Sequence, residues 1–123
     1  MVYAADFVAL LLKQRGDTYV WGAQARDTDP DPSVFDCSEL VRWGCARLGV
    51  RPTMPDGTWT QYRHCHQYGT VTSATDAAQT SGSLLFRFSS DPLATTPRDR
   101  HVAVSLGNGS TIEALGKAYG VGS

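Results

Sequence analysis

The sequence predicts an α+β fold, with helices in the N-terminal half packed on an antiparallel sheet in the C-terminal half. Three observations support this. Apolar residues recur at helical spacing in the first half, they alternate as in a strand after residue 100, and a Gly-Asn-Gly turn at 107–109 joins two alternating segments. We find no internal repeat and no linker, so we expect residues 1–123 to form one domain.

Helices are expected first. Residues 6–15 separate an apolar from a polar face and are followed by a glycine, which can end a helix. Residues 36–48 form the second helix, because Asp36 is a good N-cap and Gly49 suits the position after the C-cap. A third helix is predicted over residues 58–68.

Strands follow. Residues 84–88 are a short strand candidate, and residues 89–100 are a polar loop. Residues 101–106 alternate in polarity and predict a strand, which returns over residues 110–115 after the Gly-Asn-Gly turn. Before these elements, residues 19–22 are predicted to be extended and residues 23–35 to be a loop.

Composition excludes several classes of function. The 123 residues include 11 Lys and Arg against 12 Asp and Glu, a net charge of −1, so binding to nucleic acid or an anionic membrane by charge alone is not expected. The apolar run 7–12 is too short to span a bilayer, and no basic segment precedes it. We therefore expect neither membrane insertion nor a signal peptide, and action outside the cytoplasm would need delivery by, or fusion to, a larger protein.

No metal or cofactor is expected. Asp27, Asp29 and Asp31 alternate in the 23–35 loop, but the glycine and closing glutamate of a calcium loop are missing. The His-Cys-His segment at 64–66 has poor spacing for zinc, since adjacent helical residues diverge by about 100°.

The cysteines indicate a thiol nucleophile. Three cysteines cannot all pair within one chain, and Cys37 is the one we expect to be free. It directly follows the N-cap Asp36, and the partial positive charge of a helix N-terminus favours a thiolate. Packing in the core is the alternative role for Cys37 and the expected one for Cys45.

A histidine and a glutamate are candidates to complete the site. His101 opens its strand on a face with small residues, which leaves room for a helix N-terminus. If the loop at 107–109 has three residues, Glu113 lies on the same face as a diagonal neighbour of His101, whereas a two-residue turn would reverse its face. A carboxylate there would orient the imidazole and stabilise its charged form. The alternatives are that His101 is a surface residue at the end of its strand and that Glu113 is a solvated residue.

Three segments closely resemble the NlpC/P60 family of cysteine peptidases: Tyr-Val-Trp-Gly at 19–22, Asp-Cys-Ser-Glu-Leu-Val at 36–41 and His-Val-Ala-Val-Ser-Leu-Gly-Asn-Gly at 101–109. The resemblance runs from about residue 7 to residue 115 and implies a papain-like α+β fold. Glu39 departs from it, since a glycine is common there. Relatives usually continue into another strand, whereas no strand is predicted here after residue 115.

The resemblance implies a role for each matching residue. Cys37 would be the nucleophile and His101 the general base, and Glu113 stands at the third polar position. Tyr19 matches a tyrosine beside the nucleophile, with a packed aromatic as its alternative role. The residues expected on the oxyanion and substrate side are Tyr19, Asp36 and Ser38, and those expected to be structural are Trp21 and Gly22.

The predicted function is a cysteine endopeptidase that hydrolyses peptidoglycan stem peptides at the bacterial cell wall, through a Cys-His-Glu triad and an acyl-enzyme. The resemblance implies cleavage of the γ-D-glutamyl to diamino acid bond. Three alternatives are a CHAP-like N-acetylmuramoyl-L-alanine amidase, a papain-like acyltransferase and a non-catalytic cell-wall-binding module. A phage lysin, a tail-associated hydrolase, a toxin with an immunity protein and a host remodelling enzyme all suit the sequence.

Overall fold

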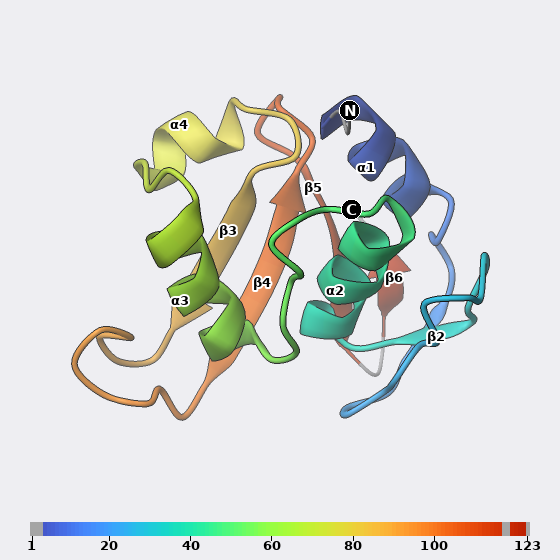
Figure 1. Ribbon diagram of the computed structural model, residues 1–123, viewed down its shortest axis with the longest axis horizontal. Helices are drawn as coiled ribbons and strands as arrows, with labels where there is room; N and C mark the ends of the chain where they lie inside the picture. Colours follow the sequence, from blue (N-terminus) through green and yellow to red (C-terminus); the bar gives the residue numbers. More distant parts are fainter. Residues whose placement is uncertain (1–3, 117–118, 123) are drawn as a thin grey trace.

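The computed structural model describes residues 4–116 and 119–122, and it confirms the predicted α+β class, with helices packed on an antiparallel sheet (Figure 1). In the described residues the sheet has the order β3-β4-β5-β6, and β1 and β2 form a short parallel pair. The elements in chain order are α1 (Ala4–Leu12), β1 (Thr18–Tyr19), β2 (Val34–Phe35), α2 (Cys37–Arg47), α3 (Thr58–Tyr68), α4 (Ala74–Ala78), β3 (Leu84–Phe88), β4 (Arg100–Ser105), β5 (Thr111–Gly116) and β6 (Gly120–Gly122).

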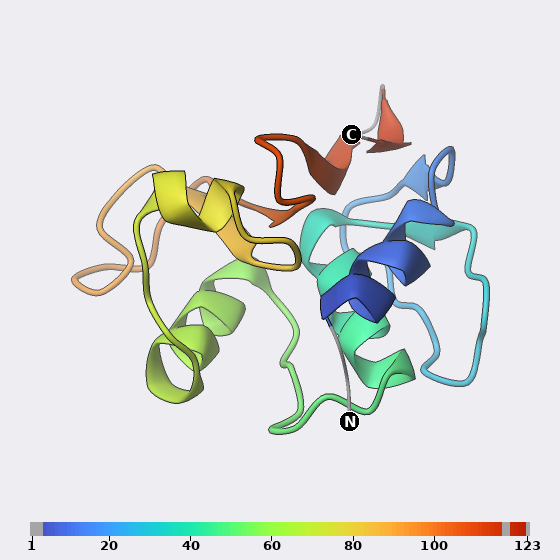
Figure 2. The same cartoon turned by 90° about the horizontal axis from the view of Figure 1, so that it is seen from above.

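Helices α1 and α2 lie side by side (Figure 2). Gly44 permits their close approach, because a Cβ atom at this position would lie 2.8 Å from Leu11 Cδ2 and 2.9 Å from Phe7 Cε1. A larger side chain would push the helices apart, which explains a glycine inside a helix despite its poor helix propensity. The buried faces of both helices join Val104 and Ile112 of the sheet in one apolar core.

Helix α3 packs on β3 at the opposite end of the molecule from α1, at the left in Figure 1. The ring of Tyr62 makes edge contacts with Phe86 and Phe88, each with ring centroids 5.3 Å apart. The Trp59 indole donates a hydrogen bond of 2.9 Å to the Pro92 carbonyl, in the loop that joins β3 to β4. The ring contacts hold α3 against β3, and the hydrogen bond joins the start of α3 to this loop.

The β4–β5 hairpin has a three-residue loop, which is the length needed to place Glu113 on the same face as His101. The Leu106 N–H donates to the Ser110 carbonyl, which leaves residues 107–109 in the loop. This register gives His101 and Glu113 the same face of the sheet.

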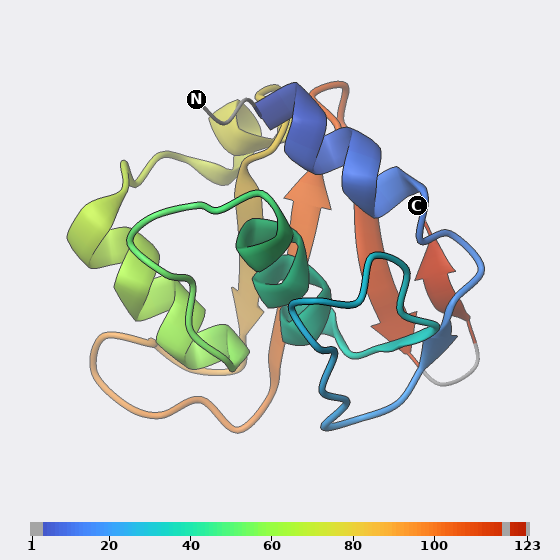
Figure 3. The same cartoon turned by 45° about the vertical axis from the view of Figure 1, so that its right-hand side comes forward.

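Strands β4 and β5 separate on the side away from the loop. Their ladder ends at the pair Val104 and Ile112, after which β5 pairs with β6 while β4 stays paired with β3. Helix α2 contacts both strands and lies over this opening (Figure 3). The opening therefore gives the N-terminus of a helix access to the edge of β4.

Strand β6 corrects the prediction that no strand follows residue 115. Gly120 has a φ of +63°, which favours glycine, and a Cβ atom there would lie only 2.3 Å from the Asp17 carbonyl oxygen. The backbone of Val121 bonds to the carbonyl of Asp17 and to the N–H of Gly16. A strand of three residues that is held by backbone contacts to a distant segment has no recognisable alternation of polar and apolar side chains.

Smaller differences concern predicted loops and helix ends. Helix α4 was not predicted, although the Ser73 hydroxyl accepts the Asp76 N–H at 3.1 Å, an N-cap that the sequence carries. Strand β2 lies at the end of the predicted 23–35 loop, and α1 ends at Leu12 rather than at residue 15. In the described parts of the chain, no helix has both the length and the apolar character needed to cross a membrane.

Candidate active site

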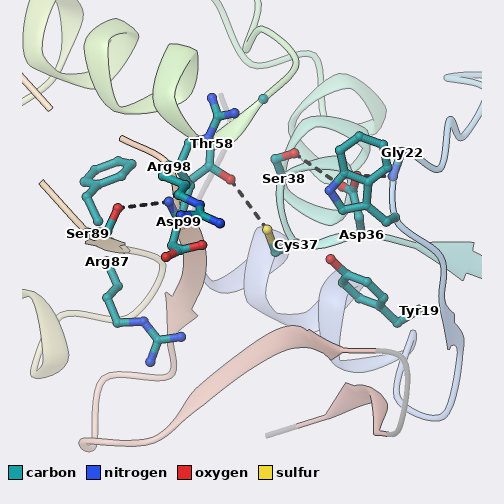
Figure 4. A pocket seen from close by; sticks show the side chains of 14 residues that line it. Tyr19, Gly22, Asp36, Cys37, Ser38, Thr58, Arg87, Ser89, Arg98 and Asp99 are labelled. Carbon is teal, nitrogen blue, oxygen red and sulfur yellow. Dashed lines mark hydrogen bonds between the residues drawn. The ribbon is translucent and has the colours of Figure 1, made fainter. Parts of the chain in front are cut away.

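A cleft of about 780 Å³ lies where the N-termini of α2 and α3 meet the β3–β4 loop (Figure 4). Cys37 stands in the middle, with Tyr19 and Asp36 on one side and Thr58 and Arg87 on the other. The residues that line the cleft are Tyr19, Trp21, Gly22, Asp36, Cys37, Ser38, Gly57, Thr58, Arg87, Phe88, Ser89, Arg98, Asp99 and Arg100.

Cys37 is the first residue of α2, and Asp36 caps the helix before it. One carboxylate oxygen of Asp36 accepts the Glu39 N–H at 2.8 Å and the Ser38 hydroxyl at 3.3 Å, and the other accepts the Gly22 N–H at 3.0 Å. Asp36 and Ser38, predicted on the oxyanion and substrate side, thus line the cleft while bonded to each other. The N–H of Cys37 has no intrahelical partner, because the first N–H groups of an α-helix lack one.

The Cys37 sulfur has several hydrogen-bond partners. Thr58 Oγ1 lies 3.5 Å from Sγ, and the His101 ring and the Val102 backbone also bond to the sulfur. Burial opposes ionisation of the thiol, but these hydrogen bonds and the charge of His101 outweigh it, so the pKa of Cys37 lies below its ordinary value. The helix N-terminus favours the thiolate further.

The Val102 N–H is free to bond to sulfur because the sheet is open here. The Ser105 N–H donates to the Ser83 carbonyl and the Asp99 carbonyl accepts the Ser89 N–H, at the two ends of β3, and the backbone groups of a strand alternate between its two sides. The N–H of Val102 therefore points toward β5, from which β4 has already separated. The backbone of Val102 bonds to the Cys37 sulfur instead of to a neighbouring strand.

His101 links the sulfur to Glu113. Its Nε2 lies 2.9 Å from Glu113 Oε1, which leaves Nδ1 for Cys37. The hydrogen bonds to Cys37 and Glu113 raise the pKa of His101 to about 9, against the effect of burial. The hydrogen bond from His101 lowers the pKa of Glu113, and the Thr111 hydroxyl donates to its other oxygen. The arrangement can therefore hold a thiolate beside an imidazolium near neutral pH.

Tyr19 faces Cys37 across the cleft, with its hydroxyl directed toward the sulfur (Figure 4). Burial and the negative charges of Cys37 and Asp36 raise the pKa of Tyr19, so its hydroxyl keeps its proton and can donate. The ring also packs against the core, which was the alternative role considered for this residue. Trp21, expected to be structural, is instead 86% exposed at the cleft, which corrects that expectation.

Thr58 belongs to the site and was missed by sequence reasoning. Gly57 has a φ of +86° and turns the chain into α3, so that Thr58 begins the helix beside Cys37. The buried amide of Gln61 donates to the carbonyls of Ser38 at 2.9 Å and Pro55 at 3.0 Å, which ties α3 to the first turn of α2. The sequence carries no local signal for this position, because the burial of Gln61 becomes evident only once α3 has docked on α2.

The acidic loop before α2 is anchored by ion pairs to Arg42. Glu39 is 2% exposed, accepts the Ala25 N–H at 2.9 Å and pairs with Arg42 Nη2 at 2.5 Å. Arg42 Nη1 in turn pairs with Asp27 at 2.6 Å. Within the described residues, no three His, Cys, Asp or Glu side chains are grouped closely enough to hold a metal ion.

Replacing Thr58 by valine is expected to make Cys37 less acidic, because a hydrogen bond to the thiolate is lost while side-chain size is kept. At a pH where the thiol is largely protonated, iodoacetamide should then alkylate Cys37 about 3- to 10-fold more slowly. Thr58→Ser retains the hydroxyl and should react like the parent protein. The labelled cysteine must be identified by peptide mapping, because Cys45 and Cys65 are also free thiols. Burial raises the pKa of Cys65, and it raises the pKa of Cys45 to about 12. Identical pH profiles for the valine and serine variants would contradict the role of the hydroxyl.

The chain matches known proteins over most of its length. The model of the NlpC/P60 family matches residues 16–122. The curated Protein P54 of Enterococcus faecium is 35% identical over 113 residues, which is 92% of this chain but only 18% of that protein. The crystal structure of the NlpC/p60 domain of the peptidoglycan hydrolase SagA is 32% identical, with a TM-score of 0.72 over 98% of this chain and 87% of that one. NlpC2 from Trichomonas vaginalis is 26% identical, with a TM-score of 0.69 over 94% of this chain and 39% of that one.

Proposed function

Because the chain belongs to the NlpC/P60 family, we propose that it is a cysteine endopeptidase that hydrolyses peptidoglycan stem peptides at the bacterial cell wall. The scissile bond we propose is the amide between γ-D-glutamate and the diamino acid. The observation that carries the proposal is the chain of contacts from the Cys37 sulfur through His101 to Glu113.

In the first half-reaction, the Cys37 thiolate attacks the amide carbonyl carbon, and the carbonyl oxygen becomes an oxyanion. The N–H of Cys37 and the Tyr19 hydroxyl are the donors available to stabilise that charge. The tetrahedral intermediate then collapses as the C–N bond breaks, and His101 Nδ1–H gives its proton to the departing amine. The product is a thioester on Cys37 with neutral His101.

In the second half-reaction, neutral His101 takes a proton from water as the hydroxide adds to the thioester carbonyl. Collapse of the second intermediate breaks the C–S bond and releases the γ-carboxyl group of D-glutamate, which loses its proton to solvent. The thiolate and the imidazolium are restored together. Throughout, Glu113 keeps the ring oriented and favours its charged form.

The proposed reaction is tested by the ends of the products. Incubation with purified muropeptides followed by mass spectrometry should reveal a new amino terminus on the diamino acid. A cut between the sugar lactyl group and L-alanine would identify an amidase instead. A product with a new acyl acceptor other than water would identify an acyltransferase, and no cleavage with an unreactive Cys37 would indicate a binding module.

Glu113→Gln is expected to lower the rate only in part, by about 10- to 100-fold, because glutamine keeps a hydrogen-bond acceptor but loses the charge. The lost charge should also lower the pKa of His101 from about 9. Since the imidazolium must be present as a proton donor, activity falls as pH rises through that pKa. The alkaline limb of kcat/KM against pH should therefore move to lower pH in the variant. An unchanged rate and an unchanged alkaline limb would make Glu113 a bystander.

A further inference from the structure

Three arginines line the cleft. Arg87 lies on β3, and Arg98 and Arg100 lie at the end of the β3–β4 loop and the start of β4. The whole chain carries 11 basic and 12 acidic side chains, so this local concentration of positive charge is not a consequence of composition. Figure 4 shows Arg87 and Arg98 across Cys37 from Tyr19. We refer to Arg87, Arg98 and Arg100 as the arginine wall.

The arginine wall is available to a ligand. All three side chains are exposed, and within the described residues none of them forms a salt bridge or a side-chain hydrogen bond. The charge of Arg87 also acts on Glu113 and helps to lower the pKa of that carboxyl. By contrast, Arg42 and Arg47 are engaged with the acidic loop before α2. Of the two acidic residues in the cleft lining, Asp36 is occupied as the cap of α2, which leaves Asp99 as the remaining carboxylate.

The sheet places the arginine wall next to the reacting groups. Arg87 is directly opposite His101 in the β3–β4 register, and Arg100 immediately precedes His101 in the chain. The loop that carries Arg98 is fixed by the hydrogen bond from Trp59 to Pro92. Arg87 is therefore held on the same face of the sheet as the histidine, and Arg98 and Arg100 line the same cleft.

A guanidinium binds a carboxylate through two parallel hydrogen bonds, and exposed arginines beside a reaction centre suit a carboxylate near the scissile bond. The proposed substrate supplies such groups. A γ-linked D-glutamate uses its side-chain carboxyl in the amide, so its α-carboxylate remains free, and the diamino acid on the other side carries a carboxylate as well. We propose that the arginine wall binds a free carboxylate within one residue of the scissile bond, and that the enzyme prefers stem peptides in which that group is not amidated. This inference rests on the proposed function and deepens it.

The test compares matched ligands. N-acetylmuramoyl-L-Ala-γ-D-Glu-L-Lys is compared with the same peptide amidated at the D-Glu α-carboxylate, and with a third form amidated at the lysine carboxylate. The parent enzyme is expected to show at least a ~10-fold lower kcat/KM for one of the two amidated forms, which identifies the carboxylate concerned. The effect should lie mainly in KM, because the contact exists before and during the reaction.

Variants connect the preference to the arginine wall. Arg87→Gln, Arg98→Gln and Arg100→Gln, alone and combined, should lower kcat/KM for the free acid and bring it toward the amide value, and lysine replacements should keep part of the preference. Arg51→Gln is the matched control, since Arg51 is exposed, bonds to Thr53 and lies outside the cleft lining. Equal kcat/KM for acid and amides in the parent enzyme, or a preference that survives the triple replacement, would overturn the inference.

A binding measurement separates this inference from the proposed reaction. Cys37→Ala cannot form an acyl-enzyme, so calorimetry with the three peptides reports recognition alone. Tighter binding of the free acid than of one amide, lost on adding the three glutamine replacements, supports the arginine wall whichever bond the active enzyme cuts. Equal binding of all three peptides contradicts it even if the product ends match the proposed endopeptidase.

Discussion

Cys37→Ala is expected to abolish release of muropeptide fragments, with a loss of at least ~10⁴-fold in rate. Among the described residues that line the cleft, Cys37 is the one thiol, and the hydroxyl groups of Thr58 and Tyr19 can bind an oxyanion or a thiolate but cannot form the thioester. The measurement is the initial rate of fragment release from purified cell wall, normalised to folded protein by circular dichroism.

Cys45→Ala is the control for this change. Cys45 lies on the same helix and is buried, with its pKa raised to about 12 by burial, so it should contribute no reactive thiolate. That variant should keep its activity while losing some stability, because a small buried side chain is shortened. Equal fragment release by Cys37→Ala and the parent protein would falsify the nucleophile assignment.

Arg42→Met is expected to have the largest effect on stability, a loss of about 3–5 kcal/mol in the free energy of unfolding. Arg42 is the cationic partner of the nearly buried Glu39 and also binds the carbonyl of Ala25 at 2.6 Å. Methionine fills similar volume but leaves the Glu39 carboxylate buried with only the Ala25 N–H as a partner. Urea unfolding at neutral pH measures the loss.

The sign of the pH dependence gives a second check on that variant. An unpaired buried carboxylate has a raised pKa, so the folded variant takes up a proton more readily than the unfolded chain as pH falls. The penalty of Arg42→Met should therefore shrink toward acid pH. Arg47→Met is the control, because exposed Arg47 makes one hydrogen bond of 3.1 Å to the Asp27 carbonyl and should change stability by only about 0.5 kcal/mol. If the loss in the free energy of unfolding did not change with pH, its cause would be lost packing rather than the unpaired Glu39 carboxylate.

The sequence was sufficient for the elements with strong periodicity or clear end signals. Helix α2 has Asp36 as its N-cap, and the Gly-Asn-Gly turn marks the β4–β5 hairpin, so both elements could be predicted. The loop length, and with it the register, was left open by the sequence. The parts that could not be predicted depend on contacts between distant segments. Strand β6 is held by the backbone of Asp17, and the two-residue strand β2 by pairing with β1. Such contacts do not produce a side-chain pattern within either segment.

The same distinction applies to the site. Cys37, His101 and Glu113 could be singled out because their chemistry is carried by side chains at the ends and faces of predictable elements. Thr58 could not, since its position beside the sulfur depends on how α3 docks on α2 through Gln61. The exposure of Trp21 likewise depends on packing and not on its neighbours in the chain.

The separation of β4 from β5 has a consequence for genetics. One of the groups that stabilise the sulfur is an amide of the main chain, and every replacement of Val102 other than proline would preserve it. Alanine scanning would therefore report residue 102 as a packing position, however much its peptide group contributes to the acidity of the neighbouring thiol. An ester linkage introduced at this one peptide bond removes the donor while leaving the side chain in place.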